Sequence, residues 1–150
     1  MNSEFCVAVH ALVFLNHKKQ IYSSEFLADN ICTNPARVRK VMSKLKKAGL
    51  VQTKEGAEGG YQFSLPAKEV SLGRICRALE ADCVSVSWRS GSLDTKCMIA
   101  SGMSNVMDQI FSNMQTACEN YLDTVTIEEI DRRLFSKTGI SGENNGNLSL

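Results

Sequence analysis

The sequence has no C-x-x-C pair among its six cysteines, and it has no long apolar run. The cysteine spacing argues against a disulfide framework and favours reduced thiols in a cytoplasmic protein. The longest apolar stretch, residues 5–15, is interrupted by His10 and is well short of the ~20 residues that a membrane span needs. No export signal is visible before it. We therefore expect a cytoplasmic chain without a membrane partner.

Catalytic and metal-binding patterns are absent as well. The chain contains no nucleophile motif, phosphate-binding loop or metalloprotease helix. Its two histidines, His10 and His17, are seven positions apart and have no carboxylate pair or cysteine at ligand spacing. We expect a packed ring at His10 and a helix-end residue at His17. The protein is predicted not to be an enzyme and not to hold a metal ion.

The composition is that of an ordinary globular domain, with 43% hydrophobic and 22% charged residues in a chain of 150. The net charge of +1 conceals a polarity, because residues 1–82 carry 12 Lys and Arg against 8 Asp and Glu, whereas residues 83–150 carry 5 against 8. Residues 33–54 contain seven basic side chains and no acid. This local excess is typical of a polyanion-binding surface, although a solvated basic helix face has the same pattern.

Three helices are predicted in the basic half of the chain. Apolar residues at helical spacing mark residues 3–16, and a second, short helix begins at Ser23 or Ser24. The third helix has the clearest limits, because Asn34 is a good N-cap, a proline follows it and Gly49 ends the helix. Its apolar residues share one face and its basic residues lie along another. A short turn between two helices, the second with a basic outer face, is the arrangement that places a recognition helix in the DNA major groove.

A β-hairpin is predicted after the third helix. Residues 50–54 and 61–65 are short strand candidates, and the six-residue loop between them contains three glycines. Glycines allow backbone N–H groups to approach phosphate oxygens, although Glu55 and Glu58 in the same loop oppose that contact. The hairpin is interpreted as the wing of a winged helix-turn-helix domain over residues 1–82, whose last helix is capped by Ser71.

The acidic half is predicted to hold a connecting loop over residues 83–96 and one long helix. From about Cys97 to Leu122, apolar residues recur alternately four and three positions apart, as in a heptad seam. We predict that this seam packs against a second copy of the chain; the alternative is a helix buried within its own domain. A capping box at Thr126 begins a short helix, so that residues 97–135 form a dimerisation unit and residues 136–150 a flexible tail.

Part of the sequence resembles a known family. The residues that carry the resemblance are Ala48-Gly49-Leu50-Val51, Gly56, Gly59-Gly60-Tyr61, Val70-Ser71-Leu72, Ile75 and Ala78-Leu79-Glu80. On this pattern the chain resembles the Rrf2 family of bacterial winged-helix transcription regulators over about residues 3–135. The resemblance implies a mainly α fold with a small β-hairpin wing, DNA binding by the N-terminal domain, dimerisation through the long helix, and a short last helix that packs across the partner.

The sensor region departs from part of that family. Members that hold an iron–sulfur cluster carry three closely spaced cysteines before the long helix, whereas this chain has only Cys83 and Cys97 there, with thirteen residues between them. The chain is more similar to the cluster-free branch, in which a Lys-Cys pair begins the long helix, as Lys96-Cys97 does here. We therefore expect no cofactor.

The cysteines fall into two groups. Cys6, Cys76 and Cys118 lie in apolar periodic segments and are expected to be buried structural residues. Cys32 precedes the basic helix and Cys97 begins the long helix, where helix dipoles and neighbouring cations favour the thiolate. Our hypothesis is that oxidation couples Cys32 to Cys97, within or between subunits, and displaces the basic helices; the alternative is that both thiols are inert.

These observations predict a homodimeric DNA-binding transcriptional regulator that responds to thiol oxidation, with repression as the favoured sense and double-stranded operator DNA as its partner. One alternative is a winged-helix module that binds protein. Another is a regulator triggered by an iron–sulfur cluster or by a small ligand between the long helix and the winged domain. The residues predicted to contact DNA are Asn34, Arg37, Lys40, Lys44, Lys47, Lys54 and Tyr61.

Overall fold

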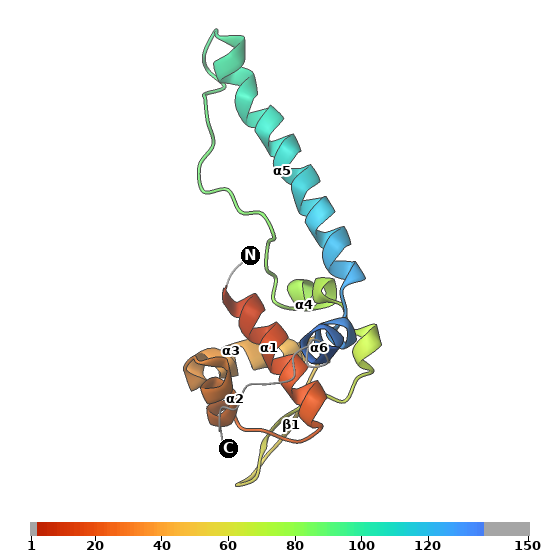
Figure 1. The fold of residues 1–150 in the computed structure, drawn as a ribbon. Helices are drawn as coiled ribbons and strands as arrows, with labels where there is room; N and C mark the ends of the chain where they lie inside the picture. Colours follow the sequence, from red (N-terminus) through yellow and green to blue (C-terminus); the bar gives the residue numbers. More distant parts are fainter. Residues whose placement is uncertain (1–2, 137–150) are drawn as a thin grey trace, which may run out of the picture.

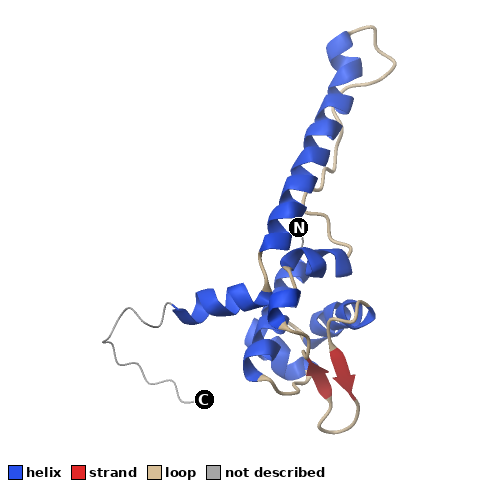
Figure 2. Ribbon diagram, turned by 90° about the vertical axis from the view of Figure 1, so that its right-hand side faces the viewer, coloured by secondary structure: helices blue, strands red, loops and turns tan. Residues whose placement is uncertain are grey.

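The computed structural model describes residues 3–136 and is mainly helical with one β-hairpin, which confirms the predicted fold class (Figure 1). The helices α1 to α4 and the hairpin form the winged domain, α5 extends from it as a long arm, and α6 returns to pack beside α1 (Figures 1 and 2). The elements are α1 (Ser3–Lys18), α2 (Ser24–Ile31), α3 (Pro35–Lys47), β1 (Gln52–Lys54), β2 (Gly60–Gln62), η1 (Ala67–Glu69), α4 (Leu72–Ala78), α5 (Met98–Thr124) and α6 (Ile127–Ser136).

The core of the winged domain surrounds α1. This helix contacts α2, α3, α4 and α6, and it extends two residues beyond the predicted end. Its buried residues are Phe5, Val7, Ala8, Ala11, Leu12, Val13, Leu15 and Asn16. The expectation of a packed ring at His10 is wrong, because this side chain is exposed and its Nε2 lies 2.9 Å from Asn30 Oδ1.

The caps of α2 and α3 form as predicted. Ser23 Oγ accepts a hydrogen bond from the Phe26 N–H at 3.2 Å, and Asn34 Oδ1 accepts one from the Arg37 N–H at 2.8 Å. Cys32 ends α2 in the left-handed conformation, with φ 58°. These caps satisfy backbone N–H groups that have no partner within a helix. Cys32 and the Asn34 cap form the tight turn between the two helices. The buried face of α3 consists of Val38, Val41, Met42 and Leu45.

The hairpin is shorter than the sequence pattern predicted. Its antiparallel register pairs three residues on each strand, with Thr53 opposite Tyr61. The flanking apolar residues Leu50, Val51 and Phe63 lie outside the ladder, and their side chains are buried in the core. The backbone of Tyr22 also pairs with Tyr61 through two hydrogen bonds of 2.8 and 3.1 Å, which fixes the wing to the segment before α2.

The arm contrasts with this domain. Leu122 is the one buried residue among the 27 of α5. The connecting segment, residues 79–97, lies alongside the helix without regular secondary structure (Figures 1 and 2). The Val84 N–H donates to Gln115 Oε1 at 2.9 Å, and Arg89 forms an ion pair with Asp108. Among the helices of residues 3–136, none combines the length and the apolarity that crossing a bilayer requires.

The end of α5 is anchored to the winged domain. The Arg77 guanidinium donates two hydrogen bonds to the Asp123 carboxylate at 2.9 and 3.0 Å, and this arginine holds the pKa of Asp123 below its usual range. Thr126 Oγ1 then accepts from the Glu129 N–H at 3.2 Å and begins α6. The Glu129 carboxylate pairs with Arg132 and Arg133, so that only half of the expected capping box forms. Apart from Ser136, the predicted tail over residues 136–150 lies outside the described residues.

Candidate nucleic-acid interface

Exposed basic residues lie on α3 and on the hairpin of the winged domain. Arg37, Lys46 and Lys47 are exposed on α3, and Lys54 is exposed at the end of β1. Within residues 3–136, no acidic side chain lies within ion-pair distance of these four cations. We call this set the open basic surface. Its charges are available to a polyanion without first breaking an internal ion pair.

Lys40 and Lys44 are engaged differently. Their ammonium groups lie 2.5 and 2.9 Å from the carboxylate oxygens of Glu4, whose side chain is only 14% exposed, at the start of α1. Lys44 Nζ also donates to the Leu79 carbonyl at 3.4 Å, and its side chain is 34% exposed against 65% for Lys40. The hydrogen bond from Lys40, followed by that from Lys44, lowers the pKa of Glu4. Lys44 therefore helps to join α1, α3 and α4, whereas Lys40 remains largely open to solvent.

Arg39 connects the two helices of the helix-turn-helix. Its guanidinium donates to Glu25 Oε1 at 2.9 Å and to Ser24 Oγ at 3.1 Å. Hydrogen bonds from the Glu25 backbone N–H and from the Ser24 hydroxyl lower the pKa of the Glu25 carboxyl. Glu4 and Glu25 are thus the acids that partly neutralise a basic segment in which the sequence itself contains no acid.

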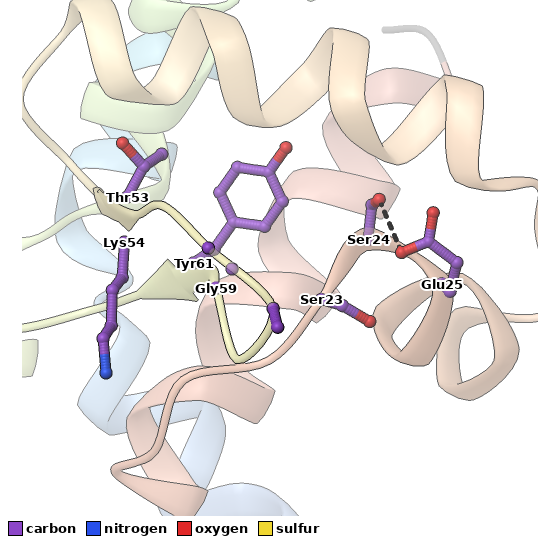
Figure 3. Close-up of a pocket in the computed structure, with 10 residues that line it drawn as sticks. Ser23, Ser24, Glu25, Thr53, Lys54, Gly59 and Tyr61 are labelled. Carbon is purple, nitrogen blue, oxygen red and sulfur yellow. Dashed lines mark hydrogen bonds between the residues drawn. The ribbon is translucent and has the colours of Figure 1, made fainter.

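A cleft of about 390 Å³ separates the start of α2 from the hairpin. Figure 3 shows Ser23, Ser24 and Glu25 on its α2 side, with Thr53, Lys54 and Tyr61 on its hairpin side. We call it the wing cleft. Burial raises the pKa of the Tyr61 phenol, so its hydroxyl is a hydrogen-bond donor at neutral pH. Hydroxyl, ammonium and glycine backbone groups together are the donors that commonly contact phosphate oxygens.

The structure brings only some of the predicted DNA-contacting residues together. Lys54 and Tyr61 share the wing cleft, while Arg37 and Lys47 lie on α3. The Asn34 side chain is already used as a helix cap. Sequence analysis missed Ser23, Ser24 and Thr53 as candidates. Their signal was weak, because a serine before a helix is first of all a capping residue.

The two predicted redox cysteines lie far apart within one chain. Cys32 is exposed in the turn between α2 and α3, and Cys97 is exposed at the N-cap of α5. The backbone N–H groups of Ala100 and Ile99 lower the pKa of the Cys97 thiol. Figure 1 shows the start of α5 at the end of the arm, remote from α2. The expectation of three buried cysteines is wrong for exposed Cys6 and partly exposed Cys118, and only Cys76 is buried.

An apolar groove lies between α1 and α6. It has a volume of about 400 Å³ and is lined by Phe5, Cys6, Val9, His10, Val13, Ile130 and Leu134. This volume is within the range typical of small-molecule sites. Beside the groove, His17 stacks on Phe135 with ring centroids 4.1 Å apart and lies 3.3 Å from Asp131.

Comparison with known proteins identifies the family. Residues 1–133 match the Rrf2 family, which is described as an iron-dependent transcriptional regulator. YwnA of Bacillus subtilis, which is named as a candidate HTH-type transcriptional regulator, is 30% identical over 135 residues, covering 90% of this chain and 99% of YwnA. The HTH-type transcriptional regulator NsrR of Oceanobacillus iheyensis is 26% identical over 138 residues, covering 89% of this chain and 92% of NsrR.

The fold is likewise similar to solved structures. A crystal structure of a candidate transcriptional regulator from Lactobacillus plantarum superimposes with a TM-score of 0.77 at 26% sequence identity. The alignment covers 89% of this chain and 91% of that protein. Sequence and fold therefore agree over nearly the whole of the described chain, and the protein belongs to the Rrf2 family of transcriptional regulators.

Proposed function

We propose that this transcriptional regulator binds operator DNA with α3 in the major groove and the hairpin against the sugar–phosphate backbone. The observation that carries the proposal is the open basic surface, where Arg37, Lys46, Lys47 and Lys54 have no acidic partner within residues 3–136. Arg37 lies in the first turn of α3, the part of a recognition helix that commonly contacts base edges. Lys54 and Tyr61 lie beside the wing cleft, and we propose that they contact phosphates.

We further propose that the regulator is a homodimer that assembles through α5. An apolar stripe on this helix is exposed in the single chain: Met103, Val106, Ile110, Met114 and Tyr121 are each at least 37% exposed. Contiguous exposed apolar surface of this kind is typical of an interface, and a second copy offers an identical stripe to cover it. A two-fold dimer would present two α3 helices to two half-sites of an operator.

For the trigger, we propose oxidation of Cys32 and Cys97 to a disulfide between subunits. A disulfide within one chain would require the turn before α3 to meet the far end of the arm. We therefore propose that the bond forms between subunits. Serine at either position should abolish the covalent dimer on a non-reducing gel after oxidation. A covalent dimer that persists in both serine variants would refute this trigger.

Iron is not part of the proposal, although the family description mentions it. In the stretch 3–136, no group of three His, Cys, Asp or Glu side chains is arranged to hold a metal ion. The groove between α1 and α6 supports a small apolar ligand as the second candidate trigger.

The test is a fluorescence-anisotropy titration of the reduced protein with a duplex from upstream of its own gene, at two salt concentrations. Several phosphate contacts should give a log–log salt slope of about −0.9 per contact. Arg37→Ala should weaken binding by about 1–3 kcal/mol, roughly 5- to 150-fold, if Arg37 contacts a base. The matched control is Arg74→Ala on α4, which removes an exposed arginine outside the open basic surface.

Two outcomes would overturn the proposal. Equal binding by Arg37→Ala and wild type would show that the face assigned to DNA is wrong. No duplex binding, also after selection from a random duplex pool, would instead favour the winged-helix module that binds protein.

A further inference from the structure

Three cysteines that are distant in the sequence meet where the arm joins the winged domain. Cys76 belongs to α4, Cys83 to the connecting segment and Cys118 to α5. The Sγ atoms of Cys76 and Cys83 are 3.9 Å apart, and Cys118 is near enough to Cys83 for the two thiols to shift each other's pKa. We call these residues the joint thiols. They are separate from Cys32 and Cys97, neither of which lies in this cluster.

The backbone holds Cys76 and Cys83 in this position. Cys76 is 3% exposed, and its thiol donates to the Ala81 carbonyl at 2.8 Å. The Ala81 N–H in turn donates to the Cys76 carbonyl at 3.1 Å, just after Glu80 turns the chain with φ 52°. Two backbone contacts thus bring the connecting segment back across the end of α4. The proximity of the two sulfurs follows from this turn.

The two sulfurs differ in access and in the kind of segment that carries them. Cys76 is fixed in a helix and buried, whereas Cys83 is partly exposed in a segment without regular secondary structure. Burial raises the pKa of the Cys83 thiol, and the neighbouring Cys83 side chain raises the pKa of the Cys118 thiol. Both thiols are therefore mainly protonated at neutral pH, and their reaction with an oxidant becomes faster as the pH rises.

We propose that Cys76 and Cys83 form an intrachain disulfide, which makes the joint a second oxidation site of this regulator. The sulfurs must close from 3.9 Å to the ~2.05 Å of an S–S bond, a shift that the connecting segment can supply. The bond draws Cys83 toward α4 and away from Cys118. It thereby changes the joint through which the arm leaves the winged domain.

The reaction is thiol–disulfide exchange with a small disulfide as the oxidant. The Cys83 thiolate attacks one sulfur of the small disulfide and releases one small thiolate, leaving a mixed disulfide on Cys83. The Cys76 thiolate then attacks Cys83 Sγ and releases the second small thiolate. Each protein thiol loses its proton to solvent or to a released thiolate. The two protein sulfurs lose two electrons in total, and the small disulfide gains them.

The test treats the full-length protein with hydroxyethyl disulfide at about pH 8.5, where more of the thiols are ionised. Remaining thiols are then alkylated and the protein is digested with trypsin. Trypsin places the relevant cysteines in separate peptides: Cys76 falls in peptide 75–77, Cys83 in peptide 78–89, and Cys97 and Cys118 together in peptide 97–132. We expect the 75–77 and 78–89 peptides linked by a disulfide, with a combined mass lower by two hydrogens than that of the two reduced peptides.

Three variants keep the result interpretable. A Cys6→Ser/Cys32→Ser/Cys97→Ser protein, which lacks the exposed thiols, should still form the 75–77 to 78–89 link. Cys83→Ser should abolish it, whereas the matched control Cys118→Ser should retain it. Circular dichroism of each variant establishes that it is folded. Because the bond is within one chain, it is distinguished on a non-reducing gel from the Cys32–Cys97 link between subunits.

Two results would overturn the inference. One is a link between the 78–89 and 97–132 peptides in the triple variant, which would assign the disulfide to Cys83 and Cys118. The other is full alkylation of both Cys76 and Cys83 in unfolded samples after oxidant treatment, which would show that no bond had formed. Loss of the covalent dimer alone tests only the proposed Cys32–Cys97 trigger and does not contradict a disulfide between Cys76 and Cys83.

Discussion

The winged domain and the α5 arm differ in how their apolar residues are covered. Around α1, large side chains such as Leu12 and Leu15 are completely buried by neighbouring helices of the same chain. Along α5, Val106 is 55% exposed and Ile110 is 44% exposed, although the sequence pattern there is just as periodic. A periodic apolar stripe therefore identifies a helix face that needs a partner, but it does not say whether that partner is the same chain or another.

The largest contrast is expected in stability. Leu12→Ala should lower the free energy of unfolding by about 2–5 kcal/mol, because Leu12 is fully buried and the space it leaves cannot be refilled. Ile110→Ala on the exposed arm should change it by less than about 0.5 kcal/mol. Urea denaturation followed by circular dichroism, at the lowest workable protein concentration, measures both. Equal losses in the two variants would mean that the arm is buried within the single chain.

For self-association, the same contrast predicts that substitutions on α5 have a larger effect than substitutions in the core of the winged domain. Ile110→Asp should weaken the dimer by roughly 2 kcal/mol or more, about 30-fold, if this residue lies at the centre of the interface. Asn113→Asp adds the same charge to α5 outside the apolar stripe and should leave association nearly unchanged. Sedimentation velocity over a concentration series gives the dissociation constants. If Ile110→Asp associates as tightly as the wild type, α5 does not form the dimer interface.

Replacing a glycine by alanine should have opposite effects on stability in the wing and in α5, and both effects should be smaller than that of Leu12→Ala. A Cβ at Gly60, where φ is +156°, would lie 2.2 Å from the Tyr22 carbonyl oxygen, so Gly60→Ala should destabilise the wing by about 1–3 kcal/mol. Gly102 lies within α5 with open space around it, and Gly102→Ala should stabilise the arm by about 0.5–1 kcal/mol. Thermal unfolding compares the pair. A neutral Gly60→Ala would show that Tyr22 and Tyr61 do not pair in solution.

The smallest effect concerns Glu4 and depends on pH. Because Lys40 and Lys44 lower its pKa from the ordinary value of 4.5, ionised Glu4 stabilises the folded chain above that value. This stabilisation is lost as the pH falls through the lowered pKa of the folded state. Glu4→Gln should therefore lower the urea midpoint at pH 7, and the difference from wild type should vanish in acid.

The matched control for Glu4→Gln is Glu69→Gln, on the surface of η1. The difference in stability between Glu69→Gln and wild type should not depend on pH. A difference between Glu4→Gln and wild type that is unchanged from neutral to acid pH would contradict the ion pair with Lys40 and Lys44.

Local chemistry explains what could be predicted. Asn34 and Ser71 were identified as caps from their own side chains and the residues that follow them, and both form the expected hydrogen bonds to backbone N–H groups. The α3 helix ends before Gly49, whose φ of +71° suits glycine. These features require only contacts a few residues apart. The sequence by itself therefore determined the helices, the wing and the family pattern.

The tertiary structure decided the features that depend on distant residues. Glu4 lies 40 positions from Lys44, and nothing in the basic segment indicates that α1 supplies its acid. The joint thiols likewise come together only because α4, the connecting segment and α5 converge at the base of the arm. Periodicity tells which side of a helix is apolar, but it does not tell which other segment covers it. That choice depends on how the helices pack, since burial and ion pairing are set by distances in space.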